Sequence, residues 1–232
     1  MLFCGIFPDS QTAGILGVGA LAVMTLTANA QRIDLLDHWI AAQTNLHTWS
    51  ADLIQTRSFK TLSQPLVSTG KVWVAVPDRF RWELGQPAQT IALRQPDQLL
   101  IVYPRLKRME RYPLKEKQPG PWRDALALLE ASFPRSRTNL EAQFHILSVT
   151  ETNKVAYLSL QPRSASARKF MTDLQISFRS DNFAPVSTEL SFSDGSSMRN
   201  DFIDAVDNPP LDMELFEPKP GPDFNIVEPL RQ

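Results

Sequence analysis

Residues 70–84 carry two adjoining apolar segments that predict a pair of β-strands. In their second half Phe80, Trp82 and a leucine alternate with charged side chains, a period of two that predicts a half-buried β-strand. The first half predicts a preceding strand, and Pro77, which has no amide hydrogen to donate, marks the break between the two. We expect this pair of strands to place Trp73, Phe80 and Trp82 on a single apolar wall.

Apolar and β-branched segments separated by turn-forming residues recur along the rest of the chain. The cleanest is 174–179, in which Leu174, Ile176 and Phe178 face away from the polar residues between them. Residues 98–103 are apolar on both faces, so we expect this strand to be central and covered. Such regular spacing indicates an antiparallel meander that curls into a barrel or a sandwich. The predicted strands are 49–59, 68–76, 79–84, 90–93, 98–103, 144–149, 155–160, 174–179 and 186–192.

Two segments instead show apolar residues three and four positions apart, the spacing of an amphipathic helix. The first helix is predicted at about 32–44. The second, at about 121–133, carries Leu126, Leu129 and Phe133 on its apolar face and ends before a proline. An apolar sheet face and two apolar helix faces can collapse into an ordinary core or enclose a cavity under a lid, and the pattern by itself favours the ordinary core.

Composition and charge exclude several classes of function. The chain has 232 residues, and 24 basic against 25 acidic side chains give a net charge of -1, so no nucleic-acid partner is expected. Only 9 glycines occur, and no phosphate-binding glycine motif is among them. The chain contains one cysteine and three well-separated histidines, a pattern that makes a His/Cys metal site improbable. We therefore expect a protein that is not an enzyme and has no catalytic residues, metal or cofactor. The three histidines are His38, His47 and His145.

Residues 105–117 form the one local concentration of basic side chains. One interpretation is docking to an anionic partner or to lipid headgroups. The alternative, which we favour, is a solvated strand and turn whose lysines discourage pairing between sheet edges.

Residues 13–27 are uncharged and apolar, and Ala28-Asn29-Ala30 follows them with the small-x-small pattern of a signal-peptidase site. We expect export with cleavage after Ala30, so that 1–30 is a signal peptide and 31–232 is a single domain. A retained membrane anchor is the alternative, although this run is shorter than the ~20 apolar residues of a typical span. Cleavage would remove the only cysteine, which suits a periplasmic space where disulfides are permitted but not required.

Several stretches, in the same order, resemble the periplasmic lipoprotein carriers of the LolA-like family. WSADLIQTR at 49–57 and LIVYPRL at 100–106 are similar to two strands of that family. Well-known members carry an arginine just before the signature proline, where this chain has Val76. The other matching residues are Gly70, Trp73, Pro77, Phe80 and Trp82 in one motif and Phe216, Pro218, Pro220 and Gly221 in another.

The resemblance implies a mainly β fold: an incomplete, strongly curved antiparallel β-barrel of about eleven strands, with an N-terminal and a mid-chain helix covering its concave face. It also implies a periplasmic, monomeric carrier of lipoprotein or lipid acyl chains, which takes cargo from an inner-membrane ABC-type exporter to an outer-membrane acceptor. The alternatives are a carrier of another lipid, such as a glycolipid or polyene lipid working with a different exporter, and a regulatory sensor that binds a protein partner. The expected lipid-binding residues are Trp73, Phe80, Trp82, Ile91, Leu93, Leu174, Ile176 and Phe178 in the wall and Leu126, Leu129 and Phe133 in the lid.

Overall fold

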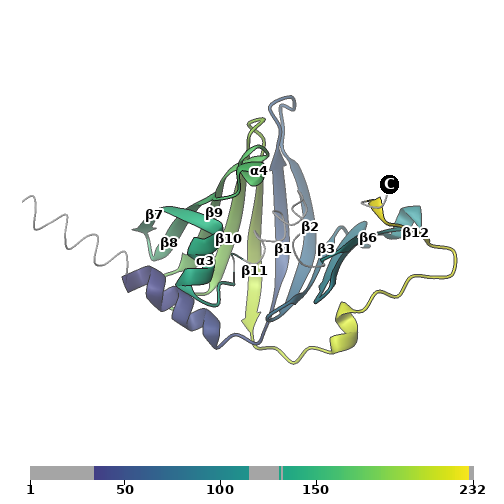
Figure 1. Cartoon of the computed structure of the whole chain (residues 1–232), viewed down its shortest axis with the longest axis horizontal. Coiled ribbons are helices and arrows are strands. Elements are labelled where there is room, and N and C mark those ends of the chain that lie inside the picture. The colour runs from purple at the N-terminus through teal and green to yellow at the C-terminus, as the bar shows by residue number, and fades with distance from the viewer. Residues whose placement is uncertain (1–33, 115–130, 132, 230–232) are drawn as a thin grey trace, which may run out of the picture.

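A computed structural model describes residues 34–114, 131 and 133–229, and its core is one curled, unclosed sheet (Figure 1). The strand order is β12-β6-β5-β4-β3-β2-β1-β11-β10-β9-β8-β7. All neighbours are antiparallel except β12 and β6, which are parallel. The predicted class, a mainly β incomplete barrel, is confirmed, with twelve strands in place of about eleven. Their bounds are β1 (Thr48–Ser58), β2 (Leu66–Ala75), β3 (Arg79–Leu84), β4 (Thr90–Gln95), β5 (Gln98–Tyr103), β6 (Arg108–Pro113), β7 (Phe144–Thr152), β8 (Val155–Pro162), β9 (Met171–Arg179), β10 (Pro185–Phe192), β11 (Ser197–Asp207) and β12 (Asn225–Val227).

A helix at 34–44 confirms the described part of the first predicted helix. The second predicted helix, 121–133, lies outside the described residues except for Ala131, which is helical, and Phe133. Short helical segments complete the fold: η1 (Pro104–Leu106), α3 (Arg137–Gln143), α4 (Ala165–Arg168) and η2 (Met213–Phe216).

One half of the concave face is filled by the helix at 34–44, which lies against the β7–β10 side of the sheet (Figure 1). Trp39 stacks on Phe178 with ring centroids 4.7 Å apart and planes 9° from parallel. Both rings are fully buried, together with Leu36 and Leu158. This half of the sheet is therefore an ordinary hydrophobic core.

The convex face is covered at its β3–β6 end by the C-terminal segment. Leu93, Leu100 and Met109 are buried there, and Phe224 from the C-terminal segment packs against them. On the opposite face of β5, Leu99 is also buried. The prediction that 98–103 is central and covered on both faces is therefore confirmed.

The elements that escaped the sequence analysis are η1, α3, α4, β11 and β12. Of these, β11 matters most, because it pairs with both β1 and β10 and so joins the two halves of the sheet. Its inward face carries Met198, Asn200 and Phe202, and the asparagine between two apolar residues interrupts the alternation that would have revealed the strand. Within the basic stretch 105–117, residues 108–113 form β6, which confirms a strand there. This strand pairs with both β5 and β12 and so is not a sheet edge, and the choice between docking and edge protection stays a prediction.

Candidate functional site

A cavity of about 500 Å³ lies on the concave face beside the filled half. Its floor comes from β1–β4 and β9–β11, and its other wall comes from residues 131 and 133–144, which include α3. In an antiparallel sheet directly opposed residues share a face, so the register of these strands determines which side chains reach the cavity. The volume is within the range of pockets that hold small ligands. The lining residues that bear on the argument are Trp49, Gln55, Val72, Val74, Val76, Asp78, Arg79, Phe80, Trp82, Ala92, Arg94, Phe133, Arg135, Leu174, Thr188, Leu190, Asn200 and Phe202.

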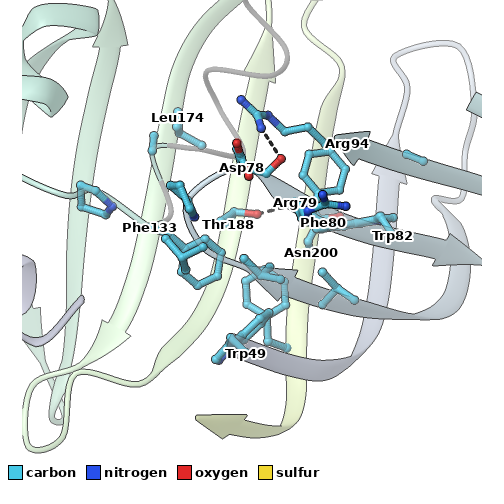
Figure 2. A pocket seen from close by; sticks show the side chains of 18 of the residues that line it. Trp49, Asp78, Arg79, Phe80, Trp82, Arg94, Phe133, Leu174, Thr188 and Asn200 are labelled. Carbon is cyan, nitrogen blue, oxygen red and sulfur yellow. Dashed lines mark hydrogen bonds between the residues drawn. The ribbon is translucent and has the colours of Figure 1, made fainter. Parts of the chain in front are cut away.

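Aromatic rings from four segments form one end of the lining. Trp49 meets Phe202 edge-to-face at 5.1 Å and Phe133 at 5.3 Å, and Trp82 meets Phe202 at 6.3 Å. These tilted and edge-to-face contacts are the geometries that aromatic pairs prefer. Figure 2 shows Trp49 and Phe133 on one side of the hollow and Trp82 across from them. The cluster therefore gives the cavity a rigid, apolar end.

Four of the predicted lipid-binding residues line this cavity: Phe80, Trp82, Phe133 and Leu174. Ile176 and Phe178 share the concave face but are buried in the filled half. Leu126 and Leu129 lie outside the described residues. Lipid binding by any of these residues stays a prediction.

The prediction that Trp73, Ile91 and Leu93 share the wall with Phe80 and Trp82 is wrong. Trp73 and Leu93 are both paired with Arg81, on the opposite face from Trp82. Ile91 and Leu93 line a separate groove under the C-terminal segment. The strand at 90–93 extends to Gln95 as β4, and Ala92 and Arg94, not the two larger apolar residues, face the cavity.

A chain of three polar side chains crosses the cavity floor from β1 through β11 to β10. We call Gln55, Asn200 and Thr188 the polar ladder. The Gln55 amide donates to Asn200 Oδ1 at 2.9 Å, and the Asn200 amide donates to Thr188 Oγ1 at 3.1 Å. The three residues are only 7%, 3% and 5% exposed. Buried polar groups of this kind are normally hydrogen-bonded, as these are, because desolvating them unpaired is costly.

The charged lining residues are one aspartate and three arginines: Asp78, Arg79, Arg94 and Arg135. Arg94 donates through Nη1 to the backbone carbonyl of Asp78 (Figure 2). Arg79 donates to Glu217 at 3.1 Å. Arg94 is directly opposed to Phe80, so it places a cation on the concave face. Val76 occupies the position where well-known members of the resembling family carry arginine, and β4 supplies an arginine to the same cavity. The sequence analysis missed Arg94 as a cavity residue because the predicted strand, 90–93, ended one residue before it.

No group of metal-ligating side chains occurs among residues 34–114, 131 and 133–229. Over the same residues, none of the helices has the length and apolar character to span a bilayer.

A model of the family described as "Outer membrane lipoprotein carrier protein LolA" matches residues 44–219. The match begins at the end of the first helix and ends just after η2, so it includes every strand that lines the cavity. The chain belongs to the LolA family. Among curated protein sequences no significant match to this LolA chain was found.

Solved structures are similar to the LolA chain at low sequence identity. One is a putative outer membrane lipoprotein-sorting protein domain from Vibrio parahaemolyticus, with 12% identity, a TM-score of 0.45, and coverage of 79% of this chain and 95% of that one. Another is the MucA/MucB complex of Pseudomonas aeruginosa, with 14% identity, a TM-score of 0.44, and coverage of 85% and 63%. A third is a DUF1329 family protein from Desulfovibrio piger, with 10% identity, a TM-score of 0.49, and coverage of 81% and 96%. Because identities and scores are low, the family assignment rests on the sequence match.

Proposed function

We propose that the chain is a periplasmic carrier that shields lipoprotein acyl chains in its cavity and ferries them from the inner membrane to the outer membrane. It accepts its cargo from an inner-membrane ABC-type exporter and delivers it to an outer-membrane acceptor. Cleavage after Ala30 would leave 31–232 as one monomeric carrier domain. The family description as an outer membrane lipoprotein carrier supports this function. The proposal requires no catalytic residue, metal, cofactor or nucleic acid.

The cavity is the observation that carries the proposal. Most of its lining is aromatic and aliphatic, so an apolar guest and this lining would both lose contact with water on binding.

An acyl chain is a guest that needs such shelter. Burial of each CH₂ contributes ~0.8 kcal/mol, so a chain of about sixteen carbons gains roughly 12 kcal/mol when it leaves water. Such a chain does not cross an aqueous gap unaided. The carrier must also release it, so the net affinity has to remain well below the full burial free energy.

The test compares two tryptophans on opposite faces of the β2–β3 hairpin. Protein exported to the periplasm and purified without detergent is examined by native mass spectrometry, and a fluorescent acyl probe is titrated into the delipidated protein. Trp82→Asp places a carboxylate in the cavity, and we expect it to abolish both lipid co-purification and probe binding. Trp73→Asp makes the same change on the opposite face and should retain both.

Wild-type protein that carries no lipid and binds no acyl probe would refute the proposal. A glycolipid or polyene lipid in the mass spectrum would show that the cargo is that lipid and not a lipoprotein. Capture of a membrane protein by lipid-free chain would favour the regulatory sensor.

A further inference from the structure

We infer that the polar ladder is a subsite that binds the carbonyl group of an ester- or amide-linked acyl chain held in the cavity. This inference rests on the proposed function and specifies the chemistry of the cargo. It begins from the position of Gln55, Asn200 and Thr188, three uncharged polar residues that lie side by side on the floor and all line the cavity. In Figure 2, Thr188 and Asn200 lie within the hollow, between Leu174 and Trp82.

The ladder has more hydrogen-bond donors than its own contacts use. Gln55 and Asn200 each carry two amide hydrogens, and Thr188 carries one hydroxyl hydrogen. The two hydrogen bonds of the ladder use one hydrogen of Gln55 and one of Asn200. Toward the other described residues, the second hydrogen of each amide and the Thr188 hydroxyl hydrogen make no hydrogen bond. Three donors therefore remain for a guest, together with the unused acceptor lone pairs of the three side-chain oxygens.

The three spare donors can bind a group that accepts hydrogen bonds. A carbonyl oxygen only accepts hydrogen bonds, so it complements spare amide and hydroxyl donors. None of the three ladder residues is charged, so the ladder favours a neutral acceptor such as an ester or amide over a carboxylate. An alkane offers no acceptor at all. An alkyl ether offers an oxygen but no carbonyl.

The ladder adjoins the aromatic end. On β11, Asn200 is two residues from Phe202, about 7 Å of strand, whereas on β1 Gln55 is six residues from Trp49, about 20 Å of strand. A chain whose carbonyl contacts the ladder can therefore extend its hydrocarbon toward Trp49 and Phe133. The ladder fixes the depth at which the chain binds, and the aromatic end receives its apolar part.

The experiment compares two ligands that differ in one carbonyl. The probes are a saturated single-chain glycerol ester and the glycerol ether of the same chain length, each displacing a fluorescent acyl probe from the purified full chain. We expect wild type to bind the ester at least roughly fivefold more tightly than the ether, the effect of about one net hydrogen bond. The near-isosteric triple variant Gln55→Met/Thr188→Val/Asn200→Leu should bind both equally, with the affinity for the ether retained.

Thr188→Val alone is the second variant, to be used if the triple variant does not fold. It should reduce the preference for the ester over the ether. Thr56→Val is the matched control, because it makes the same change on the opposite face of β1 and should leave the preference intact. Equal binding of ester and ether by wild type would overturn the subsite while leaving the carrier function in place. An ester preference that survives in a folded triple variant would also overturn it. Failure of wild type to bind either ligand would refute the carrier function, and the subsite with it.

Discussion

Both regions of the concave face carry buried apolar side chains, yet they are covered differently. Over β7–β10, the helix at 34–44 packs against the sheet and leaves Phe178 and Leu158 fully buried. Over β1–β4 and β11, the same kind of face borders a cavity of about 500 Å³. Apolar alternation along a strand therefore does not distinguish a core from a binding site. The segment that covers the strand makes the difference.

The side chains facing inward differ in kind as well. The hollow region holds the polar ladder and Arg94, whose polar atoms face a cavity. The filled region instead closes around an aromatic stack between Trp39 and Phe178. Polar groups in a packed core must be satisfied internally, whereas those in a cavity can also be satisfied by a guest.

The largest expected effect on stability comes from removing a buried side chain from the filled region. Trp39→Ala removes a fully buried ring that stacks on Phe178, so we expect the free energy of unfolding to fall by about 3–5 kcal/mol. Urea denaturation followed by circular dichroism measures the loss. His38→Ala on the exposed side of the same helix is the control and should change stability by no more than about 0.5 kcal/mol. A loss for Trp39→Ala as small as the control would show that the helix does not contribute to a core.

A second prediction adds the same ring to both regions. Ala156 is fully buried in the filled region, so Ala156→Phe overpacks it and should cost about 1–3 kcal/mol or more. Ala92 lines the cavity, so Ala92→Phe has space available and should change stability much less. Binding of the acyl probe should show the reverse order, weakening by roughly tenfold or more for Ala92→Phe and little for Ala156→Phe. Equal losses of stability would mean that the two regions are equally packed.

The smallest effect concerns Tyr112, at the far edge of the hollow region. Burial, together with its hydrogen bond to Glu110 at 2.8 Å, raises the pKa of Tyr112 to about 12. A raised pKa means that the folded state favours the neutral phenol. The resulting stabilisation is complete below pH 10 and is lost as the pH rises through about 12. An absorbance titration should show one tyrosinate transition near pH 12 that disappears in Tyr112→Phe, and a transition that persists in this variant would assign it to another tyrosine.

Much of the fold could be predicted from local pattern. Residues 79–84 and 174–179 have a strict period of two, and β3 and β9 lie where that period placed them. The less regular first half of the hairpin at 70–84 was also correctly predicted as a strand, β2. The strand β11 was missed because Asn200 stands where its inward alternation required an apolar residue. The same residue belongs to the polar ladder, so the sequence rule failed at a position with a proposed function.

The cavity residues were harder to predict because they depend on register. Ile91 and Leu93 are larger and more apolar than Ala92 and Arg94, so size and hydropathy favoured the wrong face. The pairing of Phe80 with Arg94 determines which face of β4 turns toward the cavity. This register depends on both strands, so the sequence of one strand does not reveal it.

By itself, the sequence of this protein determined the strands with clear alternation, the first helix and the membership of the LolA family, because these follow from periodicity and motifs within short stretches. Only the tertiary structure decided which apolar face is filled and which is hollow. That outcome depends on strand register and on contacts between distant segments, such as Trp39 with Phe178 and Gln55 with Asn200. Contacts over such separations leave no periodic trace in the sequence, because no short stretch contains both partners.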